Sequence, residues 1–377
     1  MIKKMIRLGD VATYINGYAF KPEERGNVGL PIIRIQDLTG NAYDLGYYDG
    51  EYPEKIEINN GDVLISWSAS LGVYIWNRGK ALLNQHIFKV IFDKVDIDKN
   101  YFVYAVHRKL AEMSMKSHGA TMKHIIKKDF DATLIPYPAL NEQIEIAANL
   151  DKVLRIIEMR KRELQSLDNL IKARFVEMFG DPVSNPYGYN KVALSDLADI
   201  KIGPFGSLLH KEDYIEGGHP LLNPSHIVDG KVSPDDKLTI SDEKYEELSA
   251  YQLKAGDVVM GRRGEMGRCA VVSEEGFLCG TGSILIRTKG EVTADYIQKI
   301  ISFPSFKKTI EDMAVGQTMP NLNVPIVASF QIIKPPVEVQ NSYYAFVEQV
   351  DKSKVVVQKA LDETQLLFDS LMQKYFG

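Results

Sequence analysis

A glycine-bounded cluster of arginines is the segment of this sequence whose residue types most clearly favour a binding chemistry. The segment from Gly261 to Arg268 reads Gly-Arg-Arg-Gly-Glu-Met-Gly-Arg and follows an apolar run expected to form a strand. Because glycines permit tight turns, Arg262, Arg263 and Arg268 are expected to project from a turn at the strand end. A guanidinium pairs bidentately with the edge of guanine or with a phosphate. The segment is therefore a candidate nucleic-acid contact, and the alternative is a solvated basic turn.

The matching position in the first half of the chain has a different chemistry. The segment Ser66–Ser70 reads Ser-Trp-Ser-Ala-Ser and also follows an apolar strand, but it is polar and aromatic rather than basic. Trp67 and Ser68 are its candidates for contacting DNA, and a structural tryptophan is the alternative. Such a difference is expected if the two halves read different sequences.

Two glycine loops, one in each half, supply most of the remaining candidates. Asparagine suits adenine edges, and lysines bind phosphates. The lysines after the first loop also fit the charged start of a helix, and Arg34, at a strand end, is either a contact or internal to the fold. The candidates are Lys123, His124, Lys127 and Lys128 after Gly119, Asn321 and Asn323 after Gly316, and Lys21 and Lys211 near aromatic or apolar segments.

Motifs of common enzyme sites are missing from the sequence. It contains no phosphate-binding loop, no dinucleotide-binding glycine motif and no histidine spacing of a zinc site. The segment Asn185–Gly188 is similar to the Asn-Pro-Pro-Tyr motif of adenine methyltransferases but lacks the second proline, and a turn is the simpler interpretation. We therefore expect no catalytic residue and no metal site; the alternative is a self-contained enzyme, such as a nuclease, with an unfamiliar site.

Two long helices are expected to hold these segments in place. Residues 141–180 contain apolar residues spaced by four and three, the heptad seam of a coiled coil, without an interrupting proline or glycine. The pattern returns 197 residues later, as Gln143 with Gln340 and Phe179 with Phe376 show. At about 1.5 Å per residue, each helix would be roughly 55 Å long. The apolar seam residues are Ile146, Leu150, Val153, Ile157, Leu164, Leu167 and Ile171, and then Val347, Val350, Val357, Leu361, Phe368 and Leu371.

Polar residues interrupt both seams. Arg160 and Arg174 stand in the first seam, and Lys354 and Thr364 in the second. Polar residues at such positions commonly determine register and orientation. We therefore expect the two helices of one chain to pair with each other as a spacer. The alternative is two coiled-coil segments that only join separate chains.

The segments before the two helices share one plan, so the chain is predicted to be an internal repeat. Each half opens on a similar pentapeptide, at Leu8–Ala12 and Leu194–Ala198, and continues through a Gly-Asp turn and an apolar strand. Helical segments follow near residues 101–115 and 294–313. The predicted division is 1–138 and 181–335 for two mixed domains, with 139–180 and 336–377 for the helices.

The composition narrows the class of protein. The chain has 377 residues, which fits two domains, and its two cysteines form neither a disulfide framework nor a Cys-x-x-Cys metal pair. Because there is no signal peptide and no run of roughly 20 apolar residues, a reducing cytoplasm is the expected location. The net charge of −5 argues against binding DNA by bulk charge alone, although local basic loops are compatible with it.

Several short motifs occur in a fixed order and return in the second half. They are Leu8–Ala12, Gly61–Ile65, Gly119–Met122, and Ile135–Gln143 with its helix. In this order and duplication the chain resembles, over nearly its whole length, the specificity subunit of type I restriction–modification systems. The second copy departs from the pattern by one inserted position near Pro336, which leaves the start of the second helix open.

The resemblance implies a fold. Two target-recognition domains would each read one part of a split DNA sequence, and the two long helices would pack antiparallel between them as a coiled-coil ruler. The predicted fold class is α+β, with two mixed α/β domains and a pseudo-twofold internal repeat. Helices of roughly 55 Å exceed one turn of DNA, about 34 Å, so both domains could occupy successive grooves.

The resemblance also implies partners. Two modification subunits would carry the methyltransferase site and two restriction subunits the ATP-driven nuclease, all acting on double-stranded DNA and none on a membrane. This chain would direct adenine methylation and restriction without catalysing either. S-adenosylmethionine, ATP and Mg would then belong to the partner subunits, with no cofactor in this chain. An alternative is the same module serving a methyltransferase without a motor subunit.

Overall fold

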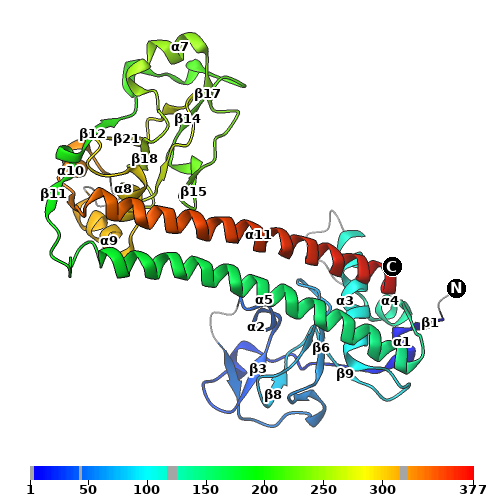
Figure 1. Ribbon diagram of the computed structural model, residues 1–377. Helices are drawn as coiled ribbons and strands as arrows, with labels where there is room; N and C mark the ends of the chain where they lie inside the picture. The colour runs from blue at the N-terminus through cyan, green and yellow to red at the C-terminus, as the bar shows by residue number, and fades with distance from the viewer. Residues whose placement is uncertain (1–3, 42–44, 117–124, 315–320) are drawn as a thin grey trace. The chain divides into compact units, whose positions relative to one another are not determined.

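The computed structural model describes residues 4–41, 45–116, 125–314 and 321–377, and these divide into two compact units. Unit 1 comprises Met1–Glu163 and Val357–Gly377, and unit 2 comprises Leu164–Val356. Each unit therefore contains one mixed domain together with a part of each long helix (Figure 1).

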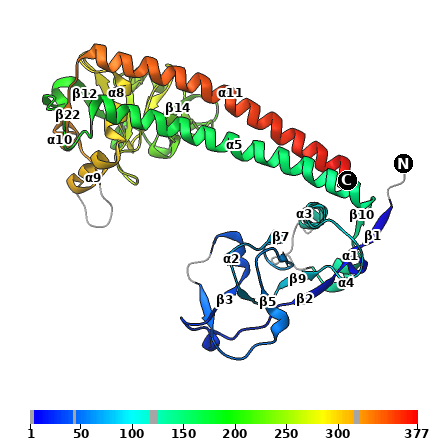
Figure 2. The same cartoon turned by 60° about the horizontal axis from the view of Figure 1, so that its bottom comes forward.

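Unit 1 contains two four-stranded sheets. Its strands are β1 (Met5–Arg7), β2 (Thr13–Asn16), β3 (Leu30–Ile33), β4 (Gly46–Tyr48), β5 (Glu57–Ile58), β6 (Val63–Ser66), β7 (Gly72–Ile75), β8 (Ala81–Leu83), β9 (Ile87–Ile91) and β10 (Leu134–Pro136). Its helices are α1 (Leu8–Val11), α2 (Ile35–Thr39), α3 (Lys99–Lys116), α4 (Lys127–Ala132) and the first part of α5 (Leu140–Phe179). The sheets have the orders β2-β9-β6-β7 and β4-β3-β8-β5, and β1 pairs with β10. Helix α3 lies against β7 and β10 (Figure 2).

Unit 2 repeats this plan. Its strands are β11 (Lys191–Ala193), β12 (Ala198–Ile202), β13 (Tyr214–Ile215), β14 (His219–Leu222), β15 (Ile227–Val228), β16 (Lys231–Val232), β17 (Thr239–Ile240), β18 (Val258–Gly261), β19 (Cys269–Val271), β20 (Leu278–Cys279), β21 (Ser283–Thr288) and β22 (Gln331–Ile333). Its helices are α6 (Leu194–Leu197), α7 (Asp242–Glu247), α8 (Ala294–Ile301), α9 (Pro304–Met313), α10 (Val324–Ala328) and part of α11 (Val337–Phe376). The sheets have the orders β12-β21-β18-β19 and β13-β17-β14-β20, and β11 pairs with β22.

The pairing of the strands confirms the predicted internal repeat and the α+β fold class. The order β2-β9-β6-β7 corresponds strand by strand to β12-β21-β18-β19, and the parallel pair β3 and β8 corresponds to β14 and β20. One difference is visible in the helical segment. Unit 1 has the single helix α3, whereas unit 2 has α8 and α9, because Pro304 begins a new helix and cannot continue the previous one.

The central strand of each unit separates two hydrophobic cores. In β6, Val63 and Ile65 join the core that contains α3, whereas Leu64 joins the core beneath the second sheet. Successive side chains of a strand point to opposite faces, so a strand buried on both faces must be apolar at every position. This accounts for the unbroken apolar run, and β18 behaves in the same way. Both strands are thus rigid supports for the residues that follow them.

The long helices pair antiparallel in each unit. In unit 1, Arg160 donates hydrogen bonds to the carbonyl oxygen of Ala360 and to the hydroxyl of Thr364. In unit 2, Lys354 pairs with Asp168, with the two charged atoms 2.6 Å apart. The polar residues of the seams therefore join the two helices. The apolar seam positions are buried or half-buried: Ile146, Leu150, Val153, Ile157, Leu164, Leu167, Ile171, Val347, Val350, Val357, Leu361, Phe368 and Leu371.

Each helix begins at an equivalent point, so the expectation of an inserted position near Pro336 was wrong: Pro335 and Gln340 stand 197 residues after Pro138 and Gln143. α5 and α11 both have 40 residues and begin 197 positions apart, at Leu140 and Val337. A fully buried glutamine ties each start to its domain. Gln143 accepts a hydrogen bond from the Asp98 amide and donates one to the Pro138 carbonyl, and Gln340 does the same with Thr293 and Pro335.

Replacing Gln143 by alanine is expected to destabilise unit 1. The substitution leaves a backbone donor and a backbone acceptor without their partner in the interior, and together these cost about 2–4 kcal/mol. Urea unfolding, followed by helix content, measures the change in the free energy of unfolding. The control is Asn141→Ala, which removes an exposed amide from the same turn. Equal stability of the two variants would contradict this role of Gln143.

Candidate nucleic-acid interface

The same hydrogen-bonded turn precedes the central strand of each unit and fixes where that strand begins. Asp62, before β6, accepts a hydrogen bond from the Asn59 amide and pairs with Lys89 at 3.1 Å. Asp257, before β18, accepts from the Lys254 amide and pairs with Arg287 at 2.7 Å. These hydrogen bonds account for the Gly-Asp turns seen in both halves of the sequence. The aspartates anchor the strands that present the candidate residues.

Trp67 and Arg262 occupy the same backbone position in the two units. The Trp67 amide donates to the His86 carbonyl, and the Trp67 carbonyl accepts from the Ile125 amide. Arg262 makes the same two bonds with Gly282 and Leu322. The correspondence expected from the sequence, between Ser66–Ser70 and the arginine segment, is therefore present in the backbone. The residues that bond to the two carbonyls, Ile125 and Leu322, come shortly after the glycine loops of the first and second half.

Arg262 is held in a defined orientation by an asparagine from the second loop. Its Nε donates to Asn321 Oδ1 at 3.0 Å, and the backbones of Arg263 and Asn321 form a bridge. Burial lowers the pKa of the Arg262 guanidinium, and the neighbouring charge of Arg263 lowers it further. An arginine stays charged under these conditions because its ordinary pKa is so high. Arg262, Asn321 and the exposed Arg263 therefore form one basic, partly desolvated cluster.

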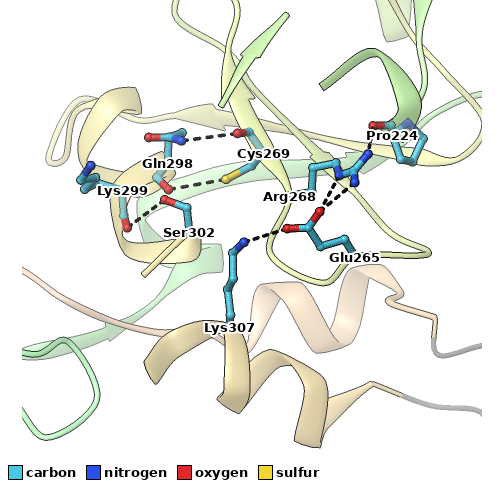
Figure 3. A network of polar contacts seen from close by, with 8 residues as sticks. All are labelled: Pro224, Glu265, Arg268, Cys269, Gln298, Lys299, Ser302 and Lys307. Atoms are coloured by element: carbon cyan, nitrogen blue, oxygen red, sulfur yellow. Dashed lines mark hydrogen bonds and ion pairs between the residues drawn. The ribbon is translucent and has the colours of Figure 1, made fainter. Parts of the chain in front are cut away.

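Arg268 lies in the same segment but is engaged within the protein. Its guanidinium pairs with Glu265 at 2.7 Å and donates to the Pro224 carbonyl, while Lys307 binds the other oxygen of Glu265 at 3.0 Å (Figure 3). Gly267 permits this contact, because a Cβ there would lie 2.7 Å from Lys307 Cγ and its φ is +73°. The network attaches the arginine turn to α9, so Arg268 positions the turn.

Trp67 is likewise both a structural and a partly exposed residue. Its ring stacks on Phe88 with centroids 5.5 Å apart, and its indole nitrogen donates to Asn16 Oδ1 at 3.2 Å. Ser68, the next residue, is buried to 9% exposure and lines a cavity together with His86. At the shared backbone position, unit 1 therefore presents an indole ring and a hydroxyl, whereas unit 2 presents two arginines.

The other candidates lie at several places. Lys127 pairs with Asp131 at 2.7 Å and lies over the Tyr14 ring, which fits the alternative of a charged helix start. Asn323 caps α10 by accepting from the Ile326 amide at 2.9 Å. Lys21, Lys128 and Lys211 are exposed, whereas Lys123 and His124 lie outside the described residues.

Both cysteines of the chain are buried in unit 2. Burial raises the pKa of Cys269 and of Cys279 to about 12, so both thiols stay protonated at neutral pH. The described residues contain no group of three or more His, Cys, Asp or Glu side chains suited to holding a metal ion.

Asn185 donates to the Tyr189 carbonyl within a tight turn, in agreement with the interpretation of Asn185–Gly188 as a turn. No described helix is long and apolar enough to cross a membrane.

Comparison with known families identifies the repeat. A family profile described as the type I restriction modification DNA specificity domain matches residues 3–169 and again residues 186–364. The chain belongs to this family. The two matched segments correspond to the two copies of the structural repeat, so each copy is one DNA specificity domain.

Known specificity subunits resemble the chain over almost its full length. The type I restriction enzyme EcoBI specificity subunit of Escherichia coli is 24% identical over 410 residues, covering 98% of this chain and 85% of that protein. The MjaVIII specificity subunit of Methanocaldococcus jannaschii is 20% identical over 394 residues, covering 96% of this chain and 89% of that protein.

Solved structures show the same fold. The S subunit of the type I restriction–modification system from M. genitalium has a TM-score of 0.55 at 15% identity, covering 99% of this chain and 96% of its own. A chain from a structure of type I R-M complex assembly and conformational transition has a TM-score of 0.67 at 16% identity, with coverages of 99% and 97%. At these identities the likeness shows the fold alone.

Sequence reasoning missed part of the surface of the first DNA specificity domain. Asn84, Gln85 and His86 follow β8 and line the same cavity as Ser68 and Arg34. No local motif marks them, because they reach this cavity only through the pairing of β8 with β3. The sequence offers only a weak signal for them, a run of three polar residues directly after an apolar strand.

Proposed function

We propose that this chain selects the DNA sequence on which a type I restriction–modification complex acts, and that its target consists of two half-sites. The observation that carries the proposal is a shared backbone position with different side chains in the two units. Trp67 and Ser68 stand there in unit 1, and Arg262 and Arg263 in unit 2. Two copies of one scaffold with different donors and acceptors suit two readers with different base preferences.

The distribution of charge supports recognition of DNA by local clusters of basic residues. The chain has a net charge of −5, so attraction to phosphates must come from clusters such as Arg262 and Arg263. Exposed lysines, among them Lys128 and Lys211, suit phosphate contacts that position the protein without reading sequence. Arginine and asparagine suit base edges, so Arg262 and Asn321 are the proposed specificity residues of unit 2.

Methylation profiling tests this function. Host DNA is sequenced for adenine methylation with the modification partner present, once with this chain and once without it. The expected result is one split, asymmetric motif that is methylated only when the chain is present. Methylation of the same motif without the chain would rule out its role in selecting the target.

The catalytic steps are assigned to partner subunits in this proposal. Two modification subunits would bind S-adenosylmethionine, and two restriction subunits would bind ATP and Mg. 

The proposed location is the cytoplasm, where the DNA and these partners are available. Methyl transfer by the purified modification partner should require this chain, and DNA cleavage should require ATP and the restriction partner. A complex that methylates its motif but never needs a motor subunit would support the related module without restriction.

The paired helices offer a surface for such partners. In unit 1, Leu366 is 69% exposed and Leu367 is 50% exposed on α11, and Met159 is 59% exposed on α5. In unit 2, Val355 and Val356 are each 68% exposed. Exposed apolar side chains are favoured at protein interfaces, so we assign the exposed apolar positions of the helices in each unit to contacts with the modification subunits.

Replacing Leu366 by glutamate is expected to weaken association with the modification subunit. A charge placed in an apolar contact must be desolvated without a partner, so an affinity loss of about 10-fold or more is expected. Co-purification and light scattering of the mixed subunits measure the association. The control is Gln365→Glu, which adds the same charge at the adjacent exposed position. Undiminished association of the Leu366 variant would remove this residue from the interface.

A further inference from the structure

An aromatic side chain of unit 2 is exposed to solvent in the loop that follows β12. Phe205 is 61% exposed, and Leu208, three residues later, is 39% exposed. Contact of apolar surface with water is unfavourable, so a ring in this position gains from a partner that covers it. Gly203 and Pro204, directly before the ring, are buried. The ring therefore extends into solvent from a backbone that packs into the domain.

The backbone that carries Phe205 is anchored to a neighbouring loop at two points. Gly203 approaches that loop so closely that a Cβ on it would lie 2.0 Å from the Gly280 carbonyl oxygen. The hydroxyl of Thr281 donates a hydrogen bond to the Pro204 carbonyl at 2.8 Å. Because these contacts fix the backbone on which the ring stands, little ordering of the chain is needed when the ring meets a partner.

Phe205 and Arg262 come from loops that leave the same edge of one sheet. Strands β12 and β18 both run antiparallel to β21, which lies between them. The Gly203 amide donates to the Ser283 carbonyl, and Gly261 pairs with Ser283 from β18. Two strand spacings of about 4.8 Å separate β12 from β18, so the two loops begin roughly 10 Å apart. A partner that meets the guanidinium is therefore within reach of the ring.

Unit 1 has a different side chain at the equivalent place. A Cβ on Gly17, after β2, would lie 2.0 Å from a carbonyl oxygen of the loop after β8, and Gly203 stands in the same relation to the loop after β20. The residue two positions later is Ala19 in unit 1 and Phe205 in unit 2. The shared fold thus forms without a ring at this position, and the phenyl group is particular to the surface of unit 2.

The chemistry of the ring limits what it can recognise on DNA. A phenyl group has no hydrogen-bond donor or acceptor to offer a phosphate or the polar part of a base edge. In the major groove, where an arginine pairs with guanine, the apolar group on a base edge is the C5 methyl of thymine. Apolar wedges between bases are used mainly by proteins that bind the minor groove. The position of the ring beside Arg262 therefore favours contact with a thymine methyl.

We propose that Phe205 reads a thymine in the half-site bound by unit 2, by packing its ring against the C5 methyl in the major groove. At about 3.4 Å per base pair, a separation of roughly 10 Å places this thymine about two to four base pairs from the base read by Arg262. This inference rests on the proposed function. It adds the recognition of an apolar group, which the arginines and asparagine of unit 2 do not provide.

Replacing thymine by uracil in the DNA removes only the methyl group and so isolates the proposed contact. Each thymine of the methylated motif is changed to uracil in turn, and competition binding measures the affinity of the chain together with its modification partner. One such change is expected to weaken binding by the wild-type chain roughly 3- to 10-fold. Phe205→Ala is expected to bind the thymine motif more weakly by a similar factor, and the same uracil should then have almost no further effect.

Two further variants test whether the effect belongs to the ring. Phe205→Leu keeps an apolar side chain and is expected to retain part of the preference for thymine over uracil. Val228→Ala removes an exposed apolar side chain from β15 and is expected to distinguish the two bases as the wild type does. Methylation of the motif at saturating concentrations of the complex verifies that each variant folds and assembles.

Three results would overturn the proposal. In the first, no uracil weakens binding by the wild-type chain. In the second, the same uracil weakens Phe205→Ala as much as the wild type. In the third, Phe205→Ala binds all sequences more weakly by one common factor, which would indicate a contact with the DNA backbone or a wedge between bases. If the wild-type chain with its partner prefers the motif no more than unrelated DNA, the proposed function itself fails.

Discussion

Arg262→Ala is expected to relax one half-site of the DNA target and leave the other intact. Arg262 directly follows β18, and its Nε donates a hydrogen bond to Asn321, so its two terminal nitrogens are the donors that we expect to meet the DNA. Loss of a bidentate arginine contact to a base costs about 1–3 kcal/mol, which corresponds to roughly 5- to 150-fold in discrimination. Competition binding of the chain with its modification partner, using DNA changed at single positions, measures the effect.

Two controls separate base reading from other roles of this segment. Arg268→Ala removes an arginine that is bound by Glu265 and the Pro224 carbonyl, and it should change specificity little. If Arg262 binds a phosphate, its loss should weaken binding equally on all sequences and lower the salt dependence by about one ion. Unchanged binding and unchanged discrimination in Arg262→Ala would exclude the residue from the interface.

Lengthening both long helices by one heptad is expected to abolish methylation of the original motif and create one with a longer spacer. Duplicating residues 164–170 of α5 and 350–356 of α11 preserves the seam and repeats the pair of Asp168 with Lys354. Seven residues add about 10 Å to each helix. Each added base pair advances the duplex by about 3.4 Å and turns it by roughly 34°, so the spacer is expected to grow by about one to three base pairs.

The matched control lengthens α5 alone. Its seam then lacks facing partners on α11, so this variant should lose assembly or methylation without gaining a new motif. Profiling all adenine methylation in cells reads both outcomes at once. An unchanged spacer in the doubly lengthened variant would sink the idea that these helices set the spacing of the half-sites.

Both long helices were predictable because their signal is periodic and local. Apolar residues at heptad spacing over 40 residues specify a long amphipathic helix, and the repeat of Gln143 at Gln340 specifies two equivalent starts. The correspondence of Trp67 with Arg262 was also predictable, because both follow the same Gly-Asp turn and apolar strand. The break between α8 and α9 was not predicted, because the residues on both sides of Pro304 have a helical pattern and were read as one helical segment.

Other features of the candidate interface depend on contacts between distant residues. Arg262 and Arg268 look alike in the sequence, yet one is oriented by Asn321 and the other is bound by Glu265, a distinction that side-chain packing alone makes. The cavity of unit 1 forms because β3 and β8 pair in parallel and bring Arg34 beside Asn84.

The sequence by itself determined the repeat, the long helices and the family, because periodicity and motif order are properties of local residue spacing. Only the tertiary structure decided which polar groups are free to meet DNA. Hydrogen bonds such as that of Arg262 with Asn321 join residues far apart in the chain, and three separate loops bring Arg34, Ser68 and Asn84 to one cavity only when the strands before them have paired.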